Sequence, residues 1–158
     1  MTKKRDLFNQ LVATFFFSGK SKFAPGTMGS LATLPLVALV YQAGFTPLFI
    51  ATVLSYFLGL YATHNLLKNS TNKDPGFVVI DETAGQLTTF LFIVPIASLS
   101  LLNLVAGFAL FRLFDIVKIW PCSYFDKKVV GAFGVMTDDI FAGIYAGIVL
   151  LCLNQFIF

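Results

Sequence analysis

Long stretches without a charged residue are the feature that most limits how this chain can fold. No Asp, Glu, Lys or Arg occurs between Lys22 and Lys68, between Glu82 and Arg112, or after Asp139. A segment buried in lipid must satisfy its own backbone hydrogen bonds, and a helix of about 20 apolar residues does so while spanning the bilayer. Only 12% of all residues are charged, against about 25% in soluble domains. We therefore expect an all-α, polytopic membrane protein.

Turn residues divide the uncharged stretches into helical hairpins within the bilayer. Gly44 and Pro47 break the first stretch, so residues 31–41 and 47–67 are predicted to enter the membrane and return. Pro95 interrupts the second stretch in the same way. The final run, 140–158, is long enough to cross once.

Two bent hairpins would bring every charged segment to one side of the membrane. Segments 1–30, 68–82 and 112–139 are then expected to share that side, with the active site among them. Five basic residues flank the first apolar segment and predict that this side is the cytoplasm: Lys3, Lys4, Arg5, Lys20 and Lys22.

Length and charge limit further the number of domains and the kind of protein that this chain can be. The 158 residues suit a single domain, 1–158. A net charge of +3 without a basic and aromatic patch gives no indication of nucleic-acid binding. Leu7–Phe17 is predicted to be an amphipathic helix at the membrane interface rather than a signal peptide, because no cleavage site follows it. Cys122 and Cys152 are expected to be free thiols.

Two pairs of adjacent acids stand beside apolar segments. Asp81 and Glu82 are expected where one helix begins, and Asp138 and Asp139 are expected in the first turn of the last helix, after a turn containing glycine. Adjacent carboxylates repel, and a divalent cation would relieve the repulsion. The alternative is that Asp138 and Asp139 only cap their helix.

Three more charged residues recur every third position. If 101–118 is helical, Arg112, Asp115 and Lys118 lie on one stripe of the helix surface. Arg112 and Lys118 could hold a phosphate, and Asp115 could either orient Arg112 or bind a metal.

The segment 23–30 reads F-A-P-G-T-M-G-S and is predicted to be a loop. Its hydroxyls and glycines, Thr27, Gly29 and Ser30 among them, could cradle a phosphate ahead of a helix. Ser30 could instead be an ordinary helix N-cap. His64 and Asp126 are further possible site residues, although an interfacial histidine more often has a structural role.

Four motifs in order resemble the phosphatidylglycerophosphatase A family. They are P-G-T-x-G-S, V-x-D-E-x-x-G, F-R-x-F-D-x-x-K-x-x-P and G-x-x-G-x-M-x-D-D-x-x-A-G, and they cover about 23–147. Two positions depart from the usual pattern: Ile119 follows Lys118 where the family has proline, and Ala132 replaces the second glycine of a pair. Both departures concern loop geometry and remove no ionisable group.

The resemblance implies a magnesium-dependent lipid phosphatase of the bacterial inner membrane that converts phosphatidylglycerophosphate to phosphatidylglycerol. Asp81, Glu82, Asp138 and Asp139 would then hold Mg²⁺, which prefers oxygen ligands. The sequence has no C-x₅-R motif and no D-x-D motif, and it leaves open whether water or an aspartate is the nucleophile. A phosphatase of another lipid phosphate, such as phosphatidic acid or a polyprenyl phosphate, and a non-enzymatic scaffold or transporter subunit are the alternatives.

Overall fold

A computed structural model describes residues 3–68 and 76–157, and all regular structure in these ranges is helical. A short 3₁₀ helix, Ser18–Lys20, follows the first of seven α-helices. Those helices are α1 (Lys3–Ala13), α2 (Pro25–Gln42), α3 (Phe45–Leu67), α4 (Ile80–Leu91), α5 (Leu101–Val117), α6 (Cys122–Lys128) and α7 (Ala132–Phe156). The predicted loop at 68–76 falls mostly on 69–75, which lie outside the described residues.

Both predicted hairpins are present. The turn between α2 and α3 contains Gly44 at φ 97°, a backbone conformation that favours glycine. The second hairpin joins α4 to α5, and the hydroxyl of Ser100 caps α5 by accepting a hydrogen bond from the backbone N–H of Asn103. Two helices, α3 and α7, are long and apolar enough to cross a membrane.

Helix α4 is the centre of the molecule and is buried along almost its whole length. Glycines let α7 approach it closely. A Cβ added to Gly143 would lie 2.3 Å from the carbonyl oxygen of Gly85, and one added to Gly85 would lie 2.5 Å from the carbonyl oxygen of Asp139. This contact fixes the acids of α7 against the first turns of α4.

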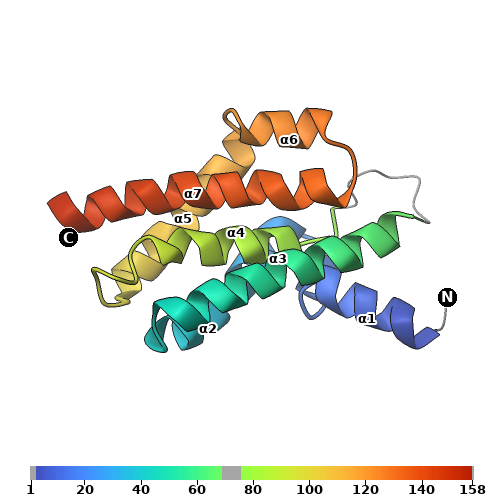
Figure 1. Cartoon of the computed structure of the whole chain (residues 1–158), viewed down its shortest axis with the longest axis horizontal. Coiled ribbons are helices and arrows are strands. Elements are labelled where there is room, and N and C mark those ends of the chain that lie inside the picture. The colour runs from blue at the N-terminus through green and yellow to red at the C-terminus, as the bar shows by residue number, and fades with distance from the viewer. Residues whose placement is uncertain (1–2, 69–75, 158) are drawn as a thin grey trace.

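The charged and uncharged parts of the chain lie at opposite ends. In Figure 1, the α2–α3 turn, the α4–α5 connection and the C-terminus lie at the left, while α1, α6 and the start of α7 lie toward the right. An apolar cluster that includes Val37, Leu48, Phe90 and Leu150 joins these helices away from the charged end. The bends therefore gather the charged segments at one end of the molecule, as the sequence predicted.

Three predicted boundaries are wrong. Residues 25–30 are not a loop, because Pro25 occupies the first turn of α2, where its missing N–H costs nothing. Helix α7 begins directly after Gly131, so Asp138 and Asp139 lie beyond its first turn. Helix α1 ends at Ala13, and the predicted continuation to Phe17 is a turn with left-handed residues.

Candidate active site

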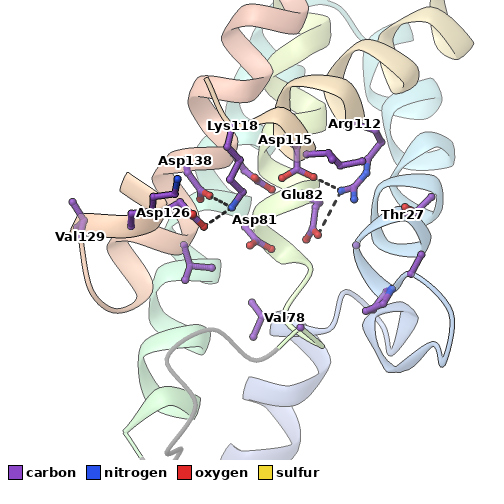
Figure 2. Close-up of a pocket in the computed structure, with 18 of the residues that line it drawn as sticks. Thr27, Val78, Asp81, Glu82, Arg112, Asp115, Lys118, Asp126, Val129 and Asp138 are labelled. Carbon is purple, nitrogen blue, oxygen red and sulfur yellow. Dashed lines mark hydrogen bonds and ion pairs between the residues drawn. The ribbon is translucent and has the colours of Figure 1, made fainter. Parts of the chain in front are cut away.

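A cavity of about 510 Å³ opens at the charged end, between the starts of α2, α4 and α7 and the ends of α5 and α6 (Figure 2). Its volume is in the range of ordinary small-molecule sites. Six carboxylates and three cations line it: Asp81, Glu82, Asp115, Asp126, Asp138 and Asp139 with Arg112, Lys118 and Lys127. The protein thus surrounds this cavity with an excess of negative charge.

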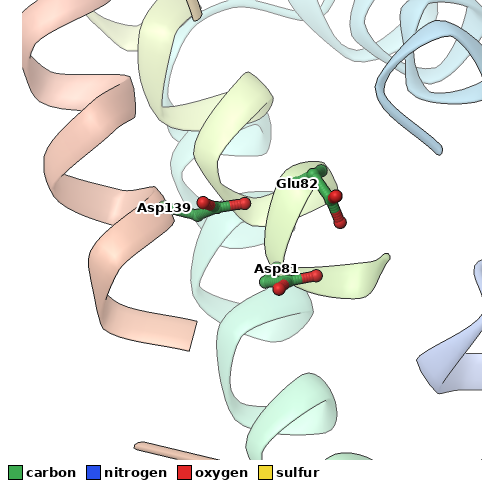
Figure 3. A group of neighbouring side chains, drawn as sticks. All are labelled: Asp81, Glu82 and Asp139. Atoms are coloured by element: carbon green, nitrogen blue, oxygen red, sulfur yellow. The ribbon is translucent and has the colours of Figure 1, made fainter. Parts of the chain in front are cut away.

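Three of the acids form a compact cluster on two helices. Ligand oxygens of Asp81, Glu82 and Asp139 lie within 4.8 Å of one another, and Figure 3 shows Asp139 of α7 projecting toward the start of α4. Asp139 is only 3% exposed and Glu82 only 9%. Buried carboxylates this close together call for a cation between them or for bound protons.

The surroundings of Glu82 show why this cluster needs a cation or a bound proton. Burial raises the pKa of the Glu82 carboxyl, a hydrogen bond with Asp81 lowers it, and the charge of Asp115 raises it again. The guanidinium of Arg112 opposes this increase without cancelling it, so the net pKa is raised. One oxygen, Glu82 Oε2, is buried with no hydrogen-bond partner among the described residues.

The side chain of Arg112 links α5 to α2 and α4. It forms an ion pair with Asp115, approaches Glu82 Oε1 at 3.6 Å, and donates to the hydroxyl of Ser30 at 3.4 Å. Of the two roles considered for Asp115, this pairing favours the orientation of Arg112. The guanidinium is held with one side toward the acid cluster and the cavity (Figure 2).

Lys118 does not share a helix stripe with Arg112 and Asp115, which corrects the predicted arrangement. Helix α5 ends at Val117, and Lys118 takes a left-handed conformation with φ 47°. Its ammonium group turns instead to Asp126 at 2.6 Å and Asp138 at 2.7 Å. Burial opposes the charge of Lys118, but these hydrogen bonds raise its pKa above the ordinary value.

Asp138 therefore faces a lysine, whereas its neighbour Asp139 faces the acid cluster. Adjacent residues on a helix point about 100° apart, so two neighbouring acids cannot both point to one centre in the same way. The four acids that were expected to share a metal divide into a cluster of three and the ion pair of Asp138. One oxygen, Asp138 Oδ1, is buried without a hydrogen-bond partner among the described residues.

The remaining predicted residues do not all reach the cavity. Thr27 lines the cavity, and Ser30 contacts it only through Arg112. Gly29 packs against Val79, where a Cβ would lie 2.5 Å from the Val79 side chain, so its small size serves helix packing. His64 is exposed and lies outside this cavity, beside the start of α7.

Sequence reasoning did not single out Lys127, Val129 or Val130 as site residues, although all three line the cavity. Their proximity to Asp126 along the chain was the available signal. Gly26 was expected to be one of the glycines that let a phosphate approach the backbone of 23–30. A Cβ there would lie 2.2 Å from Glu82 Oε1, so Gly26 makes room for a cluster carboxylate.

The donor set fits a hard divalent cation. All three cluster ligands are carboxylates, which suits Mg²⁺ better than metals that favour sulfur or imidazole. The unpartnered oxygen of Glu82 is available to such an ion. The lining also needs added positive charge before a phosphate could enter, because its carboxylates outnumber its cations.

Two long apolar helices, together with a buried carboxylate cluster that lines a cavity, indicate a helical protein that associates with membranes and has a carboxylate-rich site. Residues 11–154 match the family profile of phosphatidylglycerophosphatase A. The chain belongs to the phosphatidylglycerophosphatase A family, and it is a phosphatase acting on phosphoric monoesters.

Curated relatives agree with this assignment. The chain is 41% identical to a phosphatidylglycerophosphatase A of Haemophilus influenzae, over 96% of this chain and 93% of that protein. It is 36% identical to the Escherichia coli phosphatidylglycerophosphatase A, over 89% and 80%. It is also 39% identical, over 94% of each chain, to a Bacteroides thetaiotaomicron protein provisionally named a phosphatidylinositol-3-phosphatase. No solved structure matches the chain significantly.

Proposed function

We propose that this protein hydrolyses phosphatidylglycerophosphate to phosphatidylglycerol and phosphate in a Mg²⁺-dependent reaction, at the cytoplasmic face of a bacterial inner membrane. The observation that carries the proposal is the cluster of Asp81, Glu82 and Asp139 beside Arg112, inside a cavity large enough for a phosphoglycerol headgroup. Family membership supports the substrate.

Each residue has a role that its contacts support. Asp81, Glu82 and Asp139 would hold Mg²⁺, which when bound neutralises phosphoryl oxygens and polarises the phosphorus centre. Arg112, fixed by Asp115, presents N–H groups to the phosphoryl oxygens, and the hydroxyl of Thr27 is a neutral donor on the cavity wall.

Lys118 and Asp138 act beside the cluster rather than within it. The ammonium group of Lys118 stays charged because two carboxylates surround it. It adds a fixed positive charge to the cavity where a phosphate monoester with about two negative charges would bind. Asp138 would keep that lysine in place.

The position of the cavity suits a lipid substrate. It opens at the end where the charged segments meet, while the apolar helices extend away from it (Figure 1). A headgroup phosphate could reach the acids while the acyl chains remain in the bilayer.

Phosphate release by the detergent-purified protein tests the proposal. Phosphatidylglycerophosphate should be cleaved with kcat/KM at least about tenfold above phosphatidic acid, in Mg²⁺ but not in excess chelator. Asp139→Asn should abolish turnover and also the thermal stabilisation by Mg²⁺. Asp138→Asn should also abolish turnover by releasing Lys118, yet it should retain the stabilisation by Mg²⁺. Full activity in chelator would exclude the metal-dependent reaction.

The second candidate is a phosphatase of another lipid phosphate, favoured by the similarity to the Bacteroides thetaiotaomicron protein. A panel containing phosphatidic acid, a polyprenyl phosphate and phosphatidylinositol 3-phosphate separates the two. Equal or higher rates on one of these lipids would replace the proposed substrate while leaving the acid cluster as the reaction centre.

A further inference from the structure

Lys127 differs from the other two cations of the cavity in having no acidic partner among the residues that the structure describes. Arg112 is paired with Glu82 and Asp115, and Lys118 is paired with Asp126 and Asp138. No ion pair of Lys127 occurs within residues 3–68 and 76–157, although its side chain lines the same cavity. Its charge therefore remains available to a ligand.

The position of Lys127 places that charge at the mouth of the cavity. The acids at the floor are almost inaccessible, with Asp138 and Asp139 only 4% and 3% exposed, whereas Lys127 is an exposed residue near the end of α6. Figure 2 shows Asp126 and Val129, which flank this position in the chain, on the opposite side of the cavity from Thr27.

Apolar residues adjoin Lys127 at the mouth. Val129 and Val130 follow it in the chain and line the cavity, and Val130 is 70% exposed. Ile116, near the end of α5, is also a lining residue and is also 70% exposed. The cavity thus combines a buried acid cluster with an exposed cation and exposed apolar side chains, and the cation has no ion pair within the part of the chain that the structure describes.

A phospholipid with two phosphates has chemical groups that match these three features. Its terminal phosphate monoester would bind at the acid cluster, a glycerol would follow, and an inner phosphodiester with one negative charge would come next, before the acyl chains. Phosphatidic acid joins its single phosphate directly to the acylated glycerol, so it has no second anion for the mouth.

We propose that Lys127 binds the inner phosphodiester of the substrate and thereby selects lipids with two phosphates over lipids with one. This inference rests on the proposed function, because it assumes that the terminal phosphate is the one cleaved. Lys127 is a substrate-positioning residue here, and it acts on binding rather than on the phosphoryl group being transferred.

Kinetics of Lys127→Gln on two lipids with the same acyl chains provide the test. On phosphatidylglycerophosphate, KM should rise about tenfold with kcat nearly unchanged, because the lost contact is made equally in the ground and transition states. On phosphatidic acid, both constants should stay within about twofold. Lys127→Arg should restore the wild-type KM, since it restores the charge.

Lys128→Gln is the matched control, because Lys128 is also exposed in α6 but does not line the cavity. It should leave both lipids unaffected. An equal loss on both lipids, an unchanged ratio between them, or the same effect from Lys128→Gln would overturn the assignment of Lys127. Failure of the wild-type protein to cleave phosphatidylglycerophosphate would instead overturn the proposed function and the inference with it.

Discussion

Gly26 controls the space available to a cluster carboxylate. In α2 it lies so close to Glu82 that a Cβ would be 2.2 Å from Oε1 and 3.3 Å from the guanidinium nitrogens of Arg112. Both neighbours are the ends of flexible side chains, so the helix itself would tolerate alanine. The consequence of a larger residue would be a displaced carboxylate and a disturbed ion pair.

We therefore predict that Gly26→Ala lowers kcat/KM by at least about tenfold, since displacements near 1 Å can cost a hundredfold, while thermal stability changes little. Gly76→Ala is the control, because Gly76 lines the same cavity but a Cβ there would meet nothing within 4 Å. Similar losses in both variants would show that the cavity tolerates no added atom at all, and would remove the specific role of Gly26.

Glu82 should make the stability of the metal-free protein depend on pH. Its pKa is raised above the ordinary 4.5 by burial, so the folded state keeps the proton more tightly than the unfolded chain does. Stability is then greatest at low pH and falls as pH rises above 4.5 through the pKa of the folded state. Binding of Mg²⁺ reverses the trend, because the ion binds the deprotonated acids.

Thermal unfolding between pH 5 and pH 8 measures this effect. In chelator, the melting temperature should fall with rising pH, and in Mg²⁺ it should rise. Glu82→Gln removes the titrating group, so its decrease in chelator should be smaller. An unchanged slope in Glu82→Gln would assign the effect to other acids of the site.

At the level of elements, the contact between α4 and α7 holds the acid cluster together. Gly143 lies so close to the backbone of Gly85 that a side chain at position 143 would collide with it. Gly143→Ala should therefore force the helices apart at a cost of about 1–3 kcal/mol. Because Asp139 is one turn away from Gly143, affinity for Mg²⁺ should weaken as well.

Unfolding and metal titration of Gly143→Ala check this prediction. Ile148→Ala on the same helix is the comparison, because Ile148 is 43% exposed and packs less tightly. Its stability should change by no more than about 0.5 kcal/mol. Unchanged metal affinity in Gly143→Ala would mean that the cluster does not depend on how closely these helices pack.

The all-helical fold and its two hairpins could be predicted from the sequence, because uncharged runs and the turn residues Gly44 and Pro95 are local signals. The first turns of α2 and α7 could not. Pro25 suits both a loop and the start of a helix, so the local sequence does not decide between them, whereas in the structure Gly29 of the same helix packs against Val79. Gly134 was interpreted as part of a turn, but it lies within α7, where its missing side chain accommodates the carbonyl of Val129.

Most charged residues that line the cavity were already candidates from the sequence, but their pairing could not be predicted. Charged residues are so rare in this chain that most of them had to be functional candidates. Which carboxylate faces which cation depends on side-chain direction, and the left-handed Lys118 changed that direction in a way that three-residue spacing cannot reveal. Lys127 was not a candidate from the sequence, because spacing along the chain does not show which cations have ion-pair partners within the described residues.

For the whole molecule, we predict that both hairpin turns reach toward the side of the membrane opposite the cavity. Exposed positions Ala43 and Ser98 lie in these turns, and Lys22 and Asp126 lie at the charged end. In a variant without native cysteines, a membrane-impermeant thiol reagent added to spheroplasts should label Ala43→Cys or Ser98→Cys. It should not label Lys22→Cys or Asp126→Cys.

Lysed membranes provide the control for accessibility, since Lys22→Cys and Asp126→Cys should both react there. Labelling of Asp126→Cys but not Lys22→Cys in intact spheroplasts would place α6 and the start of α2 on different sides of the membrane. The cavity could not then form as described.

The separation of charge along the molecule also bears on how the protein enters the membrane. The uncharged runs 23–67 and 83–111 contain the hairpin turns, so no ionised side chain of either hairpin has to pass through the hydrocarbon layer. Each translocated charge would couple insertion to the transmembrane voltage by about 2.3 kcal/mol per 100 mV. Insertion of the two hairpins should therefore proceed equally well in energised and de-energised membranes.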